Sequence, residues 1–164
     1  MQHTHAAIRN EEPEAGFTLI ELMVVVLIIA ILIAVMMPTF VGAKQRAQDR
    51  AAQSTLHNGL TAAKVVFSDR GDYTLATTAA LIAVEPSLSW VASASISTGP
   101  NAVSVNPVSA SYIVIAAQSK SGRCYFLSDD ESAASVGTQF ATANGSCSAS
   151  AAPAAGSASW TAAW

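Results

Sequence analysis

The first strong pattern in the chain is a long apolar run near its start. Sixteen consecutive apolar residues extend from Leu22 to Met37, and extending the run back to Phe17 adds only Thr18 and Glu21 to its polar content. At about 1.5 Å per residue, these 21 residues would form a helix of roughly 31 Å, which matches the hydrocarbon core of a bilayer. The pattern predicts a helix able to cross a membrane.

Helical spacing continues after this run to about Ser68. The apolar stripe of this second half is spaced 4, 4, 3 and 4 residues apart: Ala52, Leu56, Leu60, Ala63 and Phe67. We therefore predict one helix over Phe17–Ser68, with its second half laid against a sheet. Pro38 is expected to kink this helix, and Asn58-Gly59 to loosen it.

The next region, 69–110, reads as a connection between helix and sheet. Asp69–Tyr73 is typical of a helix end, with Gly71 suited to a left-handed cap. The Ala/Ser/Thr-rich stretch that follows predicts a connector on the surface, with one short helix near Thr78–Val84. Asp129-Asp130-Glu131, further along, is interpreted as a solvated turn.

Strand patterns occupy the last third of the chain. β-branched and aromatic residues predict a strand at Ser111–Ala117, and Lys120-Ser121-Gly122 is a candidate hairpin turn before a return strand at Arg123–Ser128. Val136–Thr142 is expected to form a third strand, and Val103–Val105 to start another. The fold class is therefore α+β: a long N-terminal helix packed on a small antiparallel sheet of three to four strands.

Composition narrows the classes of function. Only 12% of the residues are charged, and the net charge of −3 gives no basic field for nucleic acid. Two cysteines and three scattered histidines predict no metal site, and no cofactor motif or catalytic constellation is recognisable. His57 stands alone on a helix face. We therefore expect neither an enzyme nor a nucleic-acid-binding protein.

The stretch from Gly16 to Leu22, followed by apolar residues and Pro38, resembles the leader junction of type IV prepilins. This resemblance implies cleavage by a prepilin peptidase between Gly16 and Phe17, and N-methylation of Phe17. It also implies a pilin-like fold. The segments expected on this basis are a removed leader (1–16), a transmembrane or filament-core half (17–40), an amphipathic half (41–68), a connecting region (69–110) and a sheet region (111–164).

An acidic residue inside an apolar helix is expensive, so Glu21 is a functional candidate by default. In pilins the matching acid is thought to neutralise the terminal amine of a neighbouring subunit, which would make Glu21 the residue that sets the assembly register. A pair between Glu21 and the Phe17 amine of its own chain is the alternative, and it could precede assembly. The family also implies a disulfide between Cys124 and Cys147, where the residues alone leave reduced or reactive thiols open.

Two other interpretations of the apolar run are a secretory signal peptide and a plain membrane anchor. The run is too long for the first, and the second does not explain Glu21. Lys44, Arg46 and Arg50 follow the run, whereas only Arg9 precedes it. The positive-inside rule alone would therefore place the C-terminal part in the cytoplasm, opposite to what the prepilin resemblance requires.

The tail after Cys147 is rich in small residues and need not pack. Trp160 and Trp164 within it are either a docked terminal strand or exposed contact residues. The expected function is a structural pilus subunit that waits in the membrane and is then assembled into a surface filament with copies of itself. The expected partners are the peptidase and the assembly ATPase with its platform. The alternatives are a minor pilin or adhesin and a type II secretion pseudopilin.

Overall fold

The computed structural model describes residues 16–132 and 137–164 of the chain. It divides into two compact units, the first ending at Phe40 and the second spanning Val41–Trp164. Almost all of the expected leader, residues 1–16, therefore lies outside the described residues. The folded core is built within the second unit.

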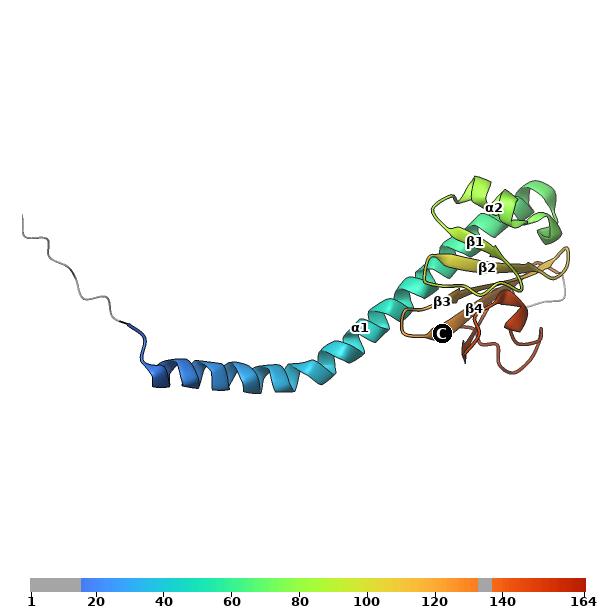
Figure 1. The fold of residues 1–164 in the computed structure, drawn as a ribbon. Coiled ribbons are helices and arrows are strands. Elements are labelled where there is room, and N and C mark those ends of the chain that lie inside the picture. The colour runs from blue at the N-terminus through green and yellow to red at the C-terminus, as the bar shows by residue number, and fades with distance from the viewer. Residues whose placement is uncertain (1–15, 133–136) are drawn as a thin grey trace, which may run out of the picture. The chain divides into compact units, whose positions relative to one another are not determined.

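The helix α1 spans Leu19–Arg70 and includes Pro38 within its length (Figure 1). The predicted helix is confirmed, with its boundaries shifted by two residues at each end. It ends within the predicted stop segment: Gly71 takes a left-handed φ of 69°, and its N–H donates to the Phe67 carbonyl at 2.6 Å. Glycine adopts this conformation without a side-chain clash, which explains why the helix stops there.

A short helix, α2, covers Thr78–Val84, as predicted. The Thr77 hydroxyl caps it by accepting from the Ala80 N–H at 3.3 Å. The expectation of a surface connector is wrong for part of this region. Leu81 is fully buried, and Trp90 is nearly so.

A five-stranded sheet follows, made of β1 (Ser89–Ala92), β2 (Ala102–Pro107), β3 (Tyr112–Gln118), β4 (Arg123–Asp130) and β5 (Gln139–Asn144). The strands lie in chain order, and all neighbours are antiparallel except β1 and β2, which are parallel. The predicted hairpin turn between β3 and β4 is confirmed, with Gly122 at a φ of 91°. The third predicted strand begins outside the described residues, and its described part overlaps β5.

The predicted count of three to four strands is too low because β1 was missed. This strand has only four residues, and only its Trp and Val favour a strand. Tertiary contacts fix it instead: the Trp90 indole N–H donates to the Glu85 carbonyl at 3.1 Å, and Trp90 pairs with Val103 of β2.

The second half of α1 lies against one face of this sheet. The predicted stripe is confirmed: Ala52, Leu56, Leu60 and Ala63 are buried, and Phe67 packs against the same core. Gly59 is buried as well, and an added Cβ there would lie 3.3 Å from Trp90 and 3.4 Å from Ile115. The expectation that Gly59 loosens the helix is therefore incomplete, because its missing side chain lets the helix approach the sheet closely.

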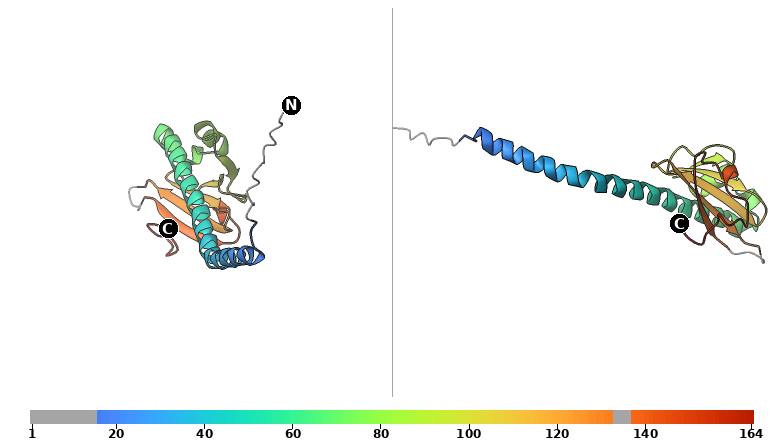
Figure 2. Two further views of the ribbon diagram at one scale, coloured as in Figure 1. Left: turned by 90° about the vertical axis from the view of Figure 1, so that its left-hand side faces the viewer. Right: turned by 90° about the horizontal axis from the view of Figure 1, so that it is seen from below.

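The opposite face of the sheet is covered by the C-terminal segment (Figure 2). Cys147, Ala149 and Trp160 pack there against residues of β3, β4 and β5, and the short 3₁₀ helix Ala149–Ala151 lies in this layer. The expectation that the tail need not pack is wrong for this part. Buried hydrogen bonds hold it, including one at 2.9 Å from the Ala149 N–H to the Ser104 hydroxyl.

We predict that Gly59→Val lowers the free energy of unfolding by about 1–3 kcal/mol, because its methyl groups overlap Trp90 and Ile115 in a packed core. Gly42→Val is the matched control, since a Cβ at that helical position meets only the end of the Arg46 side chain. Denaturation of the full chain in neutral detergent, followed by tryptophan fluorescence, measures both. Equal stability of the two variants would contradict the close contact.

Candidate functional site

The apolar half of α1 is the first candidate site, and residues 16–41 are exposed along its whole length. The most hydrophobic 18-residue window of the helix has a mean hydropathy of 3.2 and is 0% buried inside the structure. By length and composition this helix could cross a membrane. A surface of this size and apolarity is unstable in water and requires a lipid or protein environment.

Thr18 starts the helix. Its hydroxyl accepts from the Glu21 N–H at 3.2 Å, and its carbonyl accepts from the Leu22 N–H at 3.2 Å. This is the geometry of an N-cap, which satisfies donors that the first helical turn leaves open. Glu21 lies in that first turn, where the helix dipole favours a negative charge.

Gly16 and Phe17 precede the helix in an exposed segment without regular secondary structure, and Phe17 is 83% exposed. A peptide bond in this setting is accessible, unlike one inside a hydrogen-bonded helix. The structure thus places Gly16, Phe17 and Glu21 within one short stretch. Their roles in cleavage, methylation and assembly stay predictions, as does a kink at Pro38.

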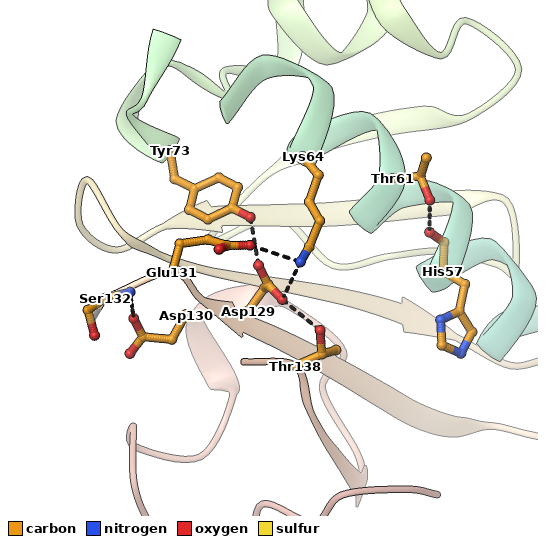
Figure 3. Close-up of polar contacts among 9 residues, drawn as sticks. All are labelled: His57, Thr61, Lys64, Tyr73, Asp129, Asp130, Glu131, Ser132 and Thr138. Atoms are coloured by element: carbon orange, nitrogen blue, oxygen red, sulfur yellow. Dashed lines mark hydrogen bonds and ion pairs between the residues drawn. The ribbon is translucent and has the colours of Figure 1, made fainter. Parts of the chain in front are cut away.

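A second polar feature lies within the folded unit, between α1 and the sheet (Figure 3). The carboxylate of Asp129 is fully buried and has three partners. It accepts from the Tyr73 hydroxyl at 2.7 Å and from the Thr138 hydroxyl at 2.6 Å, and it pairs with the Lys64 ammonium at 3.1 Å. Lys64 also binds Glu131 at 2.9 Å. We call these five residues the Asp129 cluster.

The interpretation of Asp129-Asp130-Glu131 as a solvated turn is therefore wrong for Asp129. Asp129 belongs to β4, and strand alternation turns it to the same face as Tyr125 and Leu127, toward α1. Three donors from separate parts of the chain compensate its charge there, which is the condition for keeping a carboxylate buried.

Burial alone would raise the pKa of Asp129, but hydrogen bonds from Thr138, Tyr73 and Lys64, with the attraction of Lys64, outweigh it and lower that pKa. Burial would lower the pKa of Lys64, and its two acidic partners raise it instead. The pKa of Tyr73 is raised by burial and by its bond to Asp129. At neutral pH, Asp129 is therefore a carboxylate, Lys64 an ammonium and Tyr73 a neutral hydroxyl donor, which are the states that bind one another.

The cluster connects three parts of the fold: the end of α1, the 3₁₀ turn after it (Tyr73–Leu75), and the last strands of the sheet. Such an arrangement fixes how the helix sits on the sheet. The contacts seen here join the helix to the sheet, which is a structural role. Among the residues that the structure describes, no group of three potential ligands is placed to hold a metal ion.

The C-terminal tryptophans dock on the fold. Trp160 is buried, and the neighbouring Thr161 forms a single bridge with Phe140 of β5. Trp164 packs its ring edge-on against Phe140 at 4.5 Å and against His57 at 5.4 Å. Of the two alternatives, docking is confirmed, through a bridge and ring contacts in place of a full strand.

Cys124 and Cys147 form a disulfide, with their Cα atoms 5.2 Å apart. Both are fully buried in the core on the sheet face opposite α1. The bond attaches the C-terminal segment to β4. Closing a loop of 23 residues contributes about 3 kcal/mol in the chain-entropy model.

With this geometry in place, comparison with known proteins bears on the apolar segment alone. The family model described as the prokaryotic N-terminal methylation motif matches residues 13–37. The chain carries a type IV prepilin-like leader signature. This signature supports a type IV pilin-like or pseudopilin protein, and it suggests a structural role in place of an enzymatic one. No curated protein and no solved structure matches the chain.

The prepilin-like motif covers Gly16, Phe17 and Glu21, the residues that sequence reasoning named, and their roles stay predictions. Sequence reasoning missed the Asp129 cluster. Lys64 lies off the apolar stripe, and nothing in the local pattern links it to residues 65 or more positions away. The available signal was strand alternation, which puts Asp129 in phase with Tyr125 and Leu127 once β4 is extended by two residues.

We predict that Tyr73→Phe lowers the free energy of unfolding by about 1–3 kcal/mol, since the buried Asp129 carboxylate loses a donor. The low pKa of Asp129 gives stability that is present above about pH 4, the value of an unfolded Asp, and is lost as pH falls through the folded pKa. Losing the donor raises that folded pKa, so acid unfolding should begin at higher pH.

Tyr112→Phe is the matched control. Among the described residues, the buried Tyr112 hydroxyl has no hydrogen-bond partner of acceptable geometry. Urea titrations of both variants at several pH values between 3 and 7 make the comparison. If Tyr112→Phe destabilised the chain as much as Tyr73→Phe, or if acid unfolding did not move, the role of the Tyr73 bond would be refuted.

Proposed function

We propose that the protein is a structural subunit of a type IV pilus or a related filament. Peptidase cleavage after Gly16 would expose Phe17 as the new N-terminus, which is then N-methylated. The apolar half of α1 would hold the chain in the membrane and afterwards pack with copies of itself in the filament core. The observation that carries the proposal is the prepilin-like motif at residues 13–37 on a fully exposed apolar helix.

The two halves of α1 differ in a way that supports this proposal: the first is exposed, and the second packs on the sheet. Residues after Val41 form a folded unit with its own core on both faces of the sheet. That unit does not need the apolar half for its stability. Residues 17–40 are exposed in the described chain, and a helical polymer would cover them by bringing many such helices together.

Glu21 would give this otherwise uniform packing a defined register. Cleavage creates an ammonium on Phe17, four residues before Glu21. Each charge is costly in an apolar medium, and pairing recovers much of the loss, so a neighbouring subunit docks where its Phe17 amine meets Glu21. N-methylation keeps the positive charge and therefore keeps the pair.

The partners that this function requires are other copies of the chain, the prepilin peptidase, and an assembly ATPase with a membrane platform. Before assembly, the motif and the apolar helix are consistent with anchoring in the membrane. After assembly, the folded unit would lie on the outside of an extracellular filament. A buried disulfide suits such an oxidising location.

A minor pilin, a tip adhesin or a secretion pseudopilin would use the same N-terminal segment. Abundance separates these roles. A major subunit dominates filaments sheared from the cell surface, whereas a tip protein is scarce in them, and a pseudopilin stays with the secretion machinery.

We predict that intact mass spectrometry of sheared surface material finds a dominant species that lacks Met1–Gly16 and carries one extra methyl group. Reduction should add two hydrogens, for the disulfide of Cys124 and Cys147. Full-length protein found only in the membrane fraction would refute processing and favour a plain anchor.

We predict that Glu21→Ala abolishes filaments while membrane insertion stays intact, because the apolar segment is unchanged and only the charge pair is lost. Thr39→Ala is the control: the Thr39 hydroxyl bonds only to the Met36 carbonyl of its own helix. Electron microscopy of surface filaments and membrane fractionation report the two properties. Normal piliation of the Glu21 variant would eliminate the register role.

A further inference from the structure

The charges of the folded unit are strongly segregated along α1. Lys44, Arg46, Arg50 and Lys120 lie at the end where the chain leaves the apolar segment, and we call them the basic collar. The far end of the unit carries five acidic residues beside the cations Lys64 and Arg70: Asp69, Asp72, Glu85, Asp130 and Glu131. The net charge of the whole chain, −3, conceals this separation.

The collar gathers residues from two separate parts of the chain. Lys44 lies on α1, while Lys120 lies in the turn between β3 and β4. The two line one groove of about 320 Å³, together with Ala47, Gln48, Ala51 and Pro100. A mostly apolar groove lined by two lysine side chains has the chemistry to receive a phosphate attached to a glycerol.

The cations of the collar are not neutralised within the fold. Lys44, Arg46, Arg50 and Lys120 are exposed, and the ion pairs of the described residues all belong to Lys64. Between Val41 and Arg50, Asp49 is the only acidic residue of the sequence. Its carboxylate accepts from the Ser121 hydroxyl, and hydrogen bonds to that turn, together with the attraction of Arg123, outweigh burial and lower its pKa.

Distance along the helix places Lys44 and Arg46 at the depth of lipid headgroups, and Arg50 within electrostatic reach of them. Counted from Val41 at about 1.5 Å per residue, Lys44 lies roughly 5 Å beyond the apolar segment, Arg46 about 8 Å and Arg50 about 14 Å. A headgroup layer is roughly 5–8 Å thick, and electrostatic attraction reaches about 8–10 Å further at physiological salt. The Arg46 guanidinium turns back toward the apolar end, 3.4 Å from where a Cβ of Gly42 would lie.

We propose that the basic collar binds the phosphate headgroups of anionic phospholipids while the subunit is anchored in the membrane. The inference rests on the proposed function, because it describes the state before assembly. It also gives a role to the cations after the apolar segment. The positive-inside rule would place these cations in the cytoplasm, whereas the proposed function places them outside the membrane. There they hold the folded unit against an anionic surface, and each Lys or Arg near such a surface contributes about a fivefold gain in affinity.

The test uses the full, uncleaved chain in neutral detergent, titrated with phosphatidylglycerol or with phosphatidylcholine, and native mass spectrometry counts the lipids that stay bound. We expect the chain to bind phosphatidylglycerol at least tenfold more tightly than phosphatidylcholine. K44Q/K120Q should reduce that preference about tenfold, since it removes two of the four positive charges of the collar. K44R/K120R should keep the preference, because it keeps both charges.

Arg70→Gln is the matched control for net charge, since it removes a cation from the acidic end. The proposal is overturned if Arg70→Gln reduces the preference as much as a single Lys120→Gln, or if K44Q/K120Q leaves it unchanged. It is also overturned if millimolar inorganic phosphate displaces the lipid, because the site would then bind free anions.

A second copy of the chain is the other conceivable occupant, through its acidic end. If K44Q/K120Q abolished a salt-sensitive dimer in lipid-free micelles but left lipid binding intact, the collar would be a contact between copies, and the lipid proposal would fall. Failure of the lipid test is distinguishable from failure of the filament function. Glu21→Ala is expected to retain lipid binding without filaments, and K44Q/K120Q keeps Gly16, Phe17 and Glu21.

Discussion

Small residues on α1, above all Gly59, let the helix backbone approach the sheet closely enough for Trp90 and Ile115 to fill the space beside it. The rest of the folded unit depends on this contact. It orients the apolar stripe of the helix over β2, β3 and β4. It also stabilises the four-residue strand β1, because Trp90 of this strand is buried against the helix beside Gly59. A larger side chain at Gly59 would separate the layers and expose the core.

The Asp129 cluster fixes the position of α1 along the sheet, which apolar packing alone does not specify. A carboxylate buried among hydrocarbon is tolerated only where its partners are in place, so positions of the helix that separate Asp129 from Lys64 and Tyr73 are strongly disfavoured. The disulfide plays the matching role on the other face, where it ties the C-terminal segment to β4. Each face of the sheet thus has one specific cross-link in addition to its apolar packing.

The proposed function follows from the apolar surface that the fold leaves exposed. The folded unit satisfies its own core, while residues 17–40 stay exposed and suit first a lipid and then a polymer environment. The basic collar lies at the boundary between these two parts, and the five acidic residues lie at the far end. Under the proposed function, stability belongs to the sheet unit and assembly to the apolar helix.

The sequence by itself determined the features that depend on neighbouring residues. The apolar run, the stripe from Ala52 to Phe67, the Gly71 helix end and the hairpin turn at Gly122 all follow from local periodicity or from a backbone conformation that only glycine adopts easily. The prepilin-like motif belongs here too, because it is contiguous. The tertiary structure alone decided the parallel strand β1, the packed C-terminal tail and the burial of Asp129. Each of these is stabilised by partners distant in the chain, and a local pattern carries no information about which distant groups will be present to bury a short strand or to compensate a charge.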